Sequence, residues 1–295
     1  MNEPPFVIRD EKSKEMAMPR ITPATLAGGS IRAVLAPECR LVSSIKCDEL
    51  TKAGQPLGGS MTLLYSNGMR IGTVGNADDK IEFLVAPGSY TLNVYGGSLH
   101  GRQVEVTVPA GQSTFEMKPI ELKASAMALM KGKPAPEFVD IVGWAGKPVK
   151  LADLKGQYVL VDFWGYWCGP CVHAMPVLIE LHEKFHDKGL TVIGVHVDID
   201  GDVDTVAKYD EMNSISVKEL WKGKKLPFTN ALVSGKREGE GEDRMRGGMA
   251  KLYGVLSYPT TVLIDREGKI VGKFHARDIK AATAEVEKLL AGKKE

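Results

Sequence analysis

The chain has 295 residues, a length typical of two domains, and its 43% hydrophobic and 25% charged residues are ordinary for a soluble globular protein. Its formal net charge of +1 gives no sign of nucleic acid, an anionic membrane or an acidic substrate as a partner. Four cysteines are too few for a disulfide-stapled secreted scaffold. No run reaches the roughly 18 apolar residues of a membrane span, and residues 1–20 contain no apolar run of signal-peptide length.

The first part of the chain is predicted to be a small all-β domain over residues 26–122, preceded by a flexible lead-in over residues 1–25. Four short β-like runs are separated by turn signals that contain glycine or proline. These runs are Ser60–Tyr65, Ile81–Val85, Tyr90–Tyr95 and Gln103–Val108. Short strands at this spacing favour an antiparallel sandwich. The stretches Ala86–Leu92 and Val104–Gly111 resemble the carboxypeptidase-regulatory-like or Cna-B-like β-sandwiches, which implies a fold and no activity.

Two cysteines of this part, Cys39 and Cys47, leave two interpretations open. They form a disulfide if their Cα atoms come within about 7 Å. Otherwise they are two buried free thiols. A thiol count on the denatured, unreduced protein distinguishes the two interpretations.

The remainder of the chain is predicted to be a linker followed by an α/β domain. Residues 123–134 contain lysines and a proline, which is typical of a linker. Over residues 135–295, strands alternate with helices. The predicted strands are Tyr158–Trp164, Leu190–Val197, Thr260–Ile264 and Lys269–Phe274, and the predicted helices span residues 170–186, 202–213, 247–253 and 278–290. A β-α-β unit followed by a hairpin and a terminal helix predicts a mixed sheet with helices on both faces.

The strongest signal is the segment Trp167-Cys168-Gly169-Pro170-Cys171, which follows a buried strand and opens a helix. Only a thiolate attacks a disulfide, and the free N–H groups and dipole of a helix favour an anion at its N-terminus. Cys168 is therefore predicted to be the nucleophile. Pro170 suits the first helical turn, and Cys171 lies one turn further on, within reach to resolve a mixed disulfide. The alternative, half of a zinc site, needs a second close cysteine pair, which the sequence does not contain.

Residues Val159–Cys171 resemble the active-site strand and turn of the thioredoxins, and residues 134–295 resemble the TlpA/ResA-like thioredoxins of bacterial envelopes. The resemblance implies a thioredoxin fold, with an extra β segment within Glu137–Leu151. The segment Tyr258–Asp265 matches a second motif of that family, whose proline is cis, so a cis bond is expected before Pro259. The family further implies that backbone groups of Tyr258 pair with an extended substrate segment.

Asp162 stands in the middle of an apolar strand, where a carboxylate is costly unless it is paired or functional. By resemblance it is the buried proton acceptor for Cys171, with a raised pKa. The alternative is a structural carboxylate that faces a lysine. Many relatives carry a glutamate three residues after the second cysteine, whereas this chain has Ala174, which leaves the acid–base role to Asp162 alone.

Substrate contacts and activity follow mainly from the resemblance. Trp167 is expected to be a partly exposed platform beside the nucleophile, the alternative being a core aromatic. The dipeptide Gly169-Pro170 is that of reducing family members, which implies a protein disulfide reductase that needs no cofactor. The implied partners are protein thiols or disulfides and a separate electron donor, and a monomer is expected. Relatives act outside the cytoplasm; without the resemblance, the chain as written would be assigned to the cytoplasm.

Several further patterns bear on function. His182 and His186 match H-E-x-x-H, but their helix is needed for the core and a third ligand is missing, so no metal is expected. The charged loop Gly235–Gly247 is a hypothetical partner contact.

Two rival functions are a peroxidase and a binding protein with a redox-regulated domain. Residues Phe163–Trp167 lack the proline and threonine of a peroxidatic site, and the intact cysteine pair disfavours an inactive domain.

Overall fold

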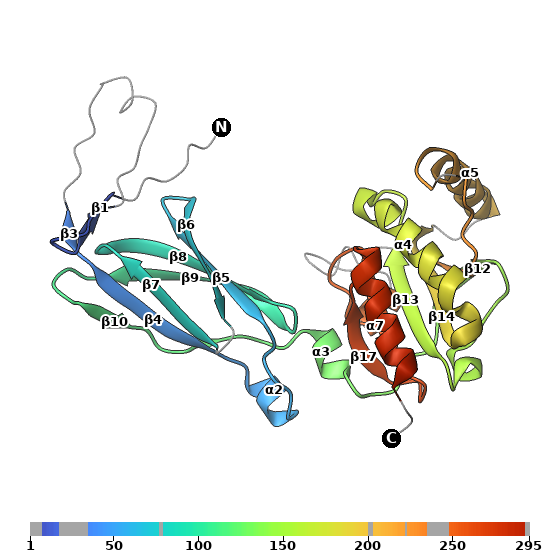
Figure 1. The fold of residues 1–295 in the computed structure, drawn as a ribbon, viewed down its shortest axis with the longest axis horizontal. Coiled ribbons are helices and arrows are strands. Elements are labelled where there is room, and N and C mark those ends of the chain that lie inside the picture. Colours follow the sequence, from blue (N-terminus) through green and yellow to red (C-terminus); the bar gives the residue numbers. More distant parts are fainter. Residues whose placement is uncertain are drawn as a thin grey trace. The chain divides into compact units, whose positions relative to one another are not determined.

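The structure is a computed structural model that describes residues 8–17, 35–76, 79–199, 203–221, 223–234 and 248–292. The chain divides into two compact units, Met1–Leu129 and Met130–Glu295 (Figure 1). No helix in the described ranges is both long and apolar enough to cross a membrane. The charged loop Gly235–Gly247, together with Asp202 as the predicted start of a helix, lies outside these ranges.

The first unit is a small sandwich of two four-stranded sheets around one hydrophobic core, as the strand pattern predicted. In one sheet, with the strand order β6-β5-β8-β9, every pair is antiparallel. In the other, β4 pairs antiparallel with β7 but parallel with β10 and β11, so the prediction of an antiparallel arrangement is wrong for these two short strands. The strands are β4 (Cys39–Lys46), β5 (Ser60–Ser66), β6 (Met69–Asn76), β7 (Lys80–Val85), β8 (Gly88–Gly96), β9 (Leu99–Val108), β10 (Thr114–Glu116) and β11 (Ile120–Glu121). Along β7, buried Ile81, Phe83 and Val85 alternate with exposed residues, which is the period-2 pattern of a strand with one buried face.

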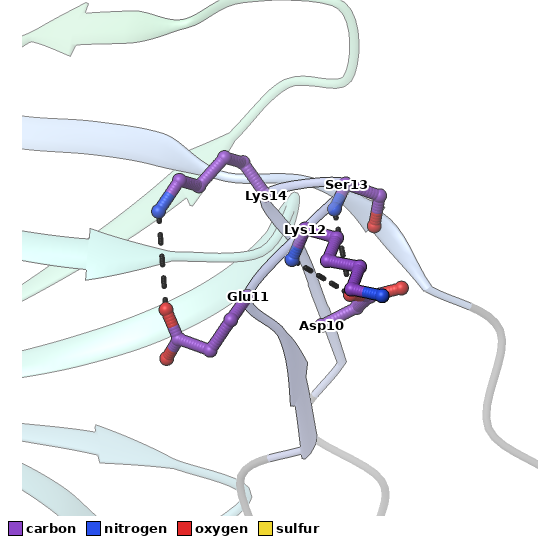
Figure 2. A network of polar contacts seen from close by, with 5 residues as sticks. All are labelled: Asp10, Glu11, Lys12, Ser13 and Lys14. Carbon is purple, nitrogen blue, oxygen red and sulfur yellow. Dashed lines mark hydrogen bonds and ion pairs between the residues drawn. The ribbon is translucent and has the colours of Figure 1, made fainter.

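Residues 8–17 form a hairpin, so the prediction of a flexible lead-in is wrong for this segment. Strand β1 (Ile8–Asp10) pairs with β2 (Glu15–Ala17), which in turn pairs with β3 (Ala36–Pro37). Figure 2 shows the turn, in which Asp10 Oδ1 accepts hydrogen bonds from the backbone N–H groups of Lys12 and Ser13 at 2.8 and 3.4 Å. These bonds hold the pKa of the Asp10 carboxyl below its ordinary value. An aspartate turn of this kind depends on local hydrogen bonds, which composition alone does not reveal.

The predicted linker, residues 123–134, is largely structured. It contains α3 (Ala126–Met130), and Ala124 and Met127 are buried in the first unit. Residues 132–135 then hydrogen-bond to the backbone around Gly268 and Ile270 in the second unit. The lysines that suggested a linker are exposed residues on either side of this short apolar helix. The first unit also contains the short α2 (Asp48–Lys52).

The second unit has the predicted thioredoxin fold, a six-stranded mixed sheet with the order β12-β15-β14-β13-β16-β17 (Figure 1). Its strands are β12 (Ile141–Ala145), β13 (Tyr158–Trp164), β14 (Leu190–Ile199), β15 (Asn230–Ser234), β16 (Thr260–Ile264) and β17 (Ile270–Phe274). Its helices are η1 (Leu151–Leu154), α4 (Gly169–Phe185), η2 (His186–Lys188), α5 (Val203–Glu219), α6 (Gly248–Leu252) and α7 (Ile279–Ala291). β13 runs parallel to β14, as the β-α-β unit predicted, and β16 pairs antiparallel with β17, as the terminal hairpin predicted. β13 also pairs antiparallel with β16.

A polar contact inside the core connects the central strand β13 with β15, which lies on the far side of β14. Trp164 Nε1 donates a hydrogen bond to Asn230 Oδ1 at 3.0 Å, and both side chains are buried. A Cβ atom at Gly194 of β14 would lie 1.7 Å from that oxygen. Because Gly194 has no side chain, the side chains of Trp164 and Asn230 can meet over β14 and connect β13 with β15.

Helix α4 contains a proline, and a tryptophan from another segment supplies the hydrogen bond that this proline cannot donate. Because Pro176 has no N–H, the carbonyl of Val172, four residues earlier, has no donor within the helix. The indole Nε1 of Trp221 donates to this carbonyl at 2.9 Å, and the Trp221 side chain is only 2% exposed. Trp221 follows α5, so the segment between β14 and β15 stabilises the first turns of α4.

We predict that Trp221→Phe lowers the free energy of unfolding by about 1–3 kcal/mol, because the Val172 carbonyl loses the hydrogen bond from the indole. Urea unfolding followed by tryptophan fluorescence measures this loss for the second unit alone, since residues 144, 164, 167 and 221 are the four tryptophans and all lie there. Trp167→Phe is the matched control, because Trp167 is 52% exposed. Equal midpoints for the two variants would contradict the role given to Trp221.

Candidate active site

The two cysteines of the central motif lie at the N-terminus of α4 and form a disulfide, with Cα atoms 5.2 Å apart. Cys168 is the residue just before the helix, and its Sγ accepts a hydrogen bond from the backbone N–H of Cys171 at 3.3 Å. Gly169 and Pro170 form the first helical positions between them. Cys168 is 6% exposed and Cys171 is fully buried, so an incoming molecule reaches the Cys168 sulfur first.

An aromatic pair, one ring exposed and the other half-buried, lies beside this disulfide. The side chain of Trp167 is 52% exposed, which places it on the surface and not in the core. Its ring meets that of Tyr258 edge-to-face, with centroids 5.3 Å apart. A Cβ atom at Gly165 would lie 2.6 Å from the Trp167 indole nitrogen, so the absence of a side chain there lets the indole lie against the backbone. Two segments that are far apart in sequence thus meet at the site.

The Tyr258–Pro259 peptide bond is cis, as the family motif predicted. The segment around it is fixed locally, because Thr260 Oγ1 donates a hydrogen bond to the carbonyl of Ser257 at 2.7 Å. Pro259 directly precedes β16, the neighbour of the central strand β13. The ring contact of Tyr258 with Trp167 therefore places this segment next to the cysteine motif.

Asp162 lies in the middle of β13 and is 1% exposed. It shares a face of the strand with Leu160 and Trp164, because alternate strand residues point the same way, and both of these belong to the core cluster that contains Cys171. Its Oδ1 accepts a hydrogen bond from Thr261 Oγ1 at 2.7 Å. Its Oδ2 has no hydrogen-bond partner within the described part of the chain.

The surroundings of Asp162 favour the protonated carboxyl. Burial raises its pKa to about 7, against the hydrogen bond from Thr261, which lowers it. No ion pair between Asp162 and a lysine occurs among the described residues, and the residue opposite on β14 is Gly194. The structural alternative, a carboxylate paired with a lysine, therefore lacks its partner there. Thr261 was missed in the sequence, because its role depends on the register of β16 against β13.

The remaining candidate residues lie elsewhere. The ring of His182 on α4 stacks on that of His186, the first residue of η2, with centroids 4.5 Å apart, and no group of three or more metal-ligating side chains occurs among the described residues. Cys39 and Cys47 are buried free thiols in the first unit, which decides between the two interpretations of this pair. Burial raises the pKa of the Cys39 thiol. Neither cysteine belongs to the site.

Comparison with known proteins places the site within one family. The Redoxin family model matches residues 130–290. The thiol-disulfide oxidoreductase ResA of Bacillus thuringiensis subsp. konkukian is 34% identical over 149 residues, which cover 50% of this chain and 72% of that protein. ResA of Bacillus subtilis is 30% identical over 148 residues, which cover 50% and 69%. Among solved structures, the thioredoxin domain of a thiol-disulfide oxidoreductase from Bacteroides vulgatus is 28% identical and covers 54% of this chain and 97% of that one, with a TM-score of 0.40.

These relatives do not favour the peroxidase or the non-enzymatic binding protein. The Redoxin model covers more than half of the chain, and its residues include the disulfide, Asp162 and the cis-proline segment. The chain therefore belongs to the Redoxin family, as a TlpA/ResA-like thiol-disulfide oxidoreductase.

Proposed function

We propose that the chain is a protein disulfide reductase in which Cys168 is the nucleophile and Cys171 the resolving cysteine. The observation that carries this proposal is the position of the two sulfurs, one at the helix N-terminus and slightly exposed, the other one turn further on and fully buried. The free N–H groups of the first turn stabilise a thiolate on Cys168. The burial of Cys171 keeps it from reacting with an external partner before Cys168 has done so.

The reaction is two successive thiol–disulfide exchanges. The Cys168 thiolate attacks one sulfur of the substrate disulfide, forms a mixed disulfide and releases the other substrate sulfur as a thiolate, which takes up a proton. The Cys171 thiol then gives its proton to Asp162 and attacks the Cys168 sulfur. This step forms the Cys168–Cys171 disulfide and releases the second substrate thiol. A dithiol donor returns the enzyme to its reduced form by the same chemistry in reverse.

Asp162 is the proposed proton acceptor in the second exchange. Its pKa of about 7 lies close to neutral pH, so the carboxyl both takes up and releases a proton there at little cost. Because Ala174 stands where many relatives have a glutamate, Asp162 acts without a second carboxylate at that position. Thr261 orients the carboxyl through its hydrogen bond to Oδ1 and leaves Oδ2 as the free acceptor.

The aromatic pair and the cis-proline segment are the proposed substrate platform. Trp167 and Tyr258 present exposed and half-buried ring surface beside Cys168. An extended substrate segment would lie against these rings, with its backbone paired to that of Tyr258 in the manner of an added strand. The rings give apolar contact area, and the backbone pairing requires no particular side chain of the substrate. Gly169 and Pro170, which carry no bulky side chain, leave the approach to Cys168 open.

The family resemblance supports further proposals about context. We infer that the chain acts as a monomer outside the cytoplasm, on protein disulfides, with a separate dithiol protein as electron donor. The relatives are named as thiol-disulfide oxidoreductases, which supports exchange with protein thiols as the class of reaction. Cell fractionation of the native host, followed with an antibody against this chain, tests the location. Gel filtration with light scattering tests the oligomeric state.

We predict that Cys171→Ser accumulates a mixed disulfide between Cys168 and its substrate, because the resolving thiol is missing. Mass spectrometry of the trapped adducts measures this and identifies the partner. Cys168→Ser is the matched control and should trap nothing. Cys39→Ser and Cys47→Ser should behave as wild type, because both thiols are buried in the first unit. Adducts that form equally in the Cys168→Ser variant would overturn the assignment of the nucleophile.

We predict that the rate of the second exchange rises with pH through about 7 in the wild type, as Asp162 loses its proton and becomes able to act as a base. In Asp162→Asn the rate should fall by about 10²–10³-fold, and the inflection near pH 7 should disappear. Rapid mixing of the reduced protein with a peptide disulfide, with acid quenching and mass spectrometry, separates this step from the first. An inflection that persists in the asparagine variant would assign the base to another group.

The same carboxyl predicts how stability depends on pH. The folded-state pKa, about 7, lies above the ordinary value of 3.8, so between these pH values the folded state holds a proton that the unfolded chain releases. Stability should therefore fall as pH rises from about 4 to about 7, by on the order of 4 kcal/mol in all. Asp162→Asn should remove this dependence and exceed the wild type in stability above pH 7. Thr261→Val, which removes the bond that lowers the pKa, should extend the fall to higher pH.

A further inference from the structure

A small cavity lies next to the proposed substrate platform, in a place that the reaction itself does not use. Its volume is 240 Å³, below the roughly 300–1,000 Å³ typical of sites for whole small molecules. Its walls come from α4, from the cis-proline segment and from the end of β17 with the loop before α7. The lining residues include Ala174, Pro259 and Thr261 together with Lys273, His275 and Arg277.

Two of these residues locate the cavity beside the sulfurs. Ala174 lies three residues after Cys171 on α4, which puts the two on neighbouring turns of one helix face. Pro259 follows Tyr258, whose ring contacts Trp167 in the cysteine motif. A substrate segment laid along the platform would therefore pass the cavity with the residues next to its own cysteine. The absence of a carboxylate at Ala174 leaves this wall without negative charge.

The polar groups that remain available in the cavity are basic. The hydroxyl of Thr260 donates to the carbonyl of Ser257, and that of Thr261 donates to Asp162, so both are already used within the protein. Lys273, His275 and Arg277 form no ion pair with a carboxylate in the described part of the chain. Asp278, next to Arg277 in sequence, accepts a hydrogen bond from the backbone N–H of Ala281 as the cap of α7.

The position of Lys273 on an edge strand can be explained without a ligand, but this explanation does not extend to His275 and Arg277. A lysine on an edge strand such as β17 discourages pairing with another chain. That role does not require His275 and Arg277 to line the same cavity as Lys273. Neighbouring atoms also keep water from the Lys273 ammonium, which lowers its pKa. An anion beside it would restore part of the lost solvation.

We propose that this basic cavity, formed around Lys273, His275 and Arg277, binds an acidic side chain of the substrate protein next to the disulfide that is reduced. The proposal rests on the proposed function and names the class of substrate. The size of the cavity suits one aspartate or glutamate side chain and not a separate ligand. The net charge of the whole chain is +1, so the preference arises from this local arrangement and not from a general attraction of anions.

The test uses the full chain, reduced with dithiothreitol and freed of it, in single-turnover reactions with synthetic peptide disulfides. The peptides have amidated C-termini and carry glutamate, glutamine or lysine at one position, which is scanned over the residues after the cysteine. The glutamate peptide should react about tenfold faster than the glutamine peptide at about 20 mM salt, and the lysine peptide more slowly than both. The difference should shrink toward equality at about 0.5 M salt, because ions screen partly exposed charges.

Variants locate the preference. Lys273→Gln combined with Arg277→Gln should react equally with the glutamate and glutamine peptides. Lys280→Gln combined with Lys288→Gln, two lysines of α7 that do not line the cavity, is the matched control and should keep the wild-type preference. Equal rates for the wild type, or a preference lost equally in both double variants, would overturn the proposal. If the first double variant does not fold, a wild-type preference that persists at high salt overturns it instead.

An uncharged disulfide separates failure of this inference from failure of the proposed function. Bis(2-hydroxyethyl) disulfide carries no acidic group, so both double variants should reduce it at the wild-type rate. If the wild type reduces this reagent but does not distinguish the peptides, only the cavity assignment falls. If the wild type reduces none of the disulfides, the proposed function falls, and the inference that rests on it falls as well.

Discussion

The proposed chemistry depends above all on a buried carboxyl in the central strand of the thioredoxin-fold unit. Asp162 occupies the middle of β13, where water is excluded and burial raises its pKa to about 7. A carboxylate in such a place costs free energy, so a strand of this kind would ordinarily hold an apolar residue. The proposed chemistry explains why a carboxyl is found there, because the second exchange requires a proton acceptor whose pKa lies near neutral pH. In this proposal the helix N-terminus favours the anion on one sulfur, and the buried carboxylate takes the proton from the other.

The elements around β13 hold this arrangement in place. Thr261 on β16 binds one oxygen of the carboxyl, while glycine at position 194 on β14 leaves room for the bond between Trp164 and Asn230. On the other side of the site, Trp221 supplies the donor that the internal proline of α4 takes away from Val172. Each contact brings together residues from different strands or helices. The geometry of the two sulfurs therefore depends on the packing of the whole unit and not on the cysteine motif alone.

Chemistry and recognition occupy different parts of this site. The proposed reacting groups are buried or nearly so. Trp167 is exposed and Tyr258 half-buried, and together with the basic side chains of the adjoining cavity they are the proposed contacts to a partner, separate from the two cysteines and the Asp162 carboxyl. The first unit carries its own core, and its two free cysteines take no part in the exchange.

Patterns along the chain are enough to identify the type of fold and the centre of the site. The apolar run Tyr158–Trp164 and the segment Thr260–Ile264 are strands with the predicted bounds, because fully buried strands are marked by continuous apolar residues. The cysteine pair was found from its motif, Asp162 was singled out by its place in an apolar strand, and the cis bond before Pro259 was implied by the family resemblance. The hairpin at residues 8–17 and the helix within residues 123–134 were missed, since both are short and depend on local hydrogen bonds or on burial against a neighbour.

Which distant residues complete the site depends on how the segments pack against one another. Thr261 meets Asp162 through the register of two strands, and Trp221 meets Val172 through the packing of a segment far along the chain. The basic cavity likewise joins a helix, a turn and an edge strand, and the net charge of +1 conceals it because charges elsewhere cancel those in its walls. Periodicity and motifs record what each segment does locally. Contacts between segments arise only when the chain is folded, which is why the sequence alone did not reveal them.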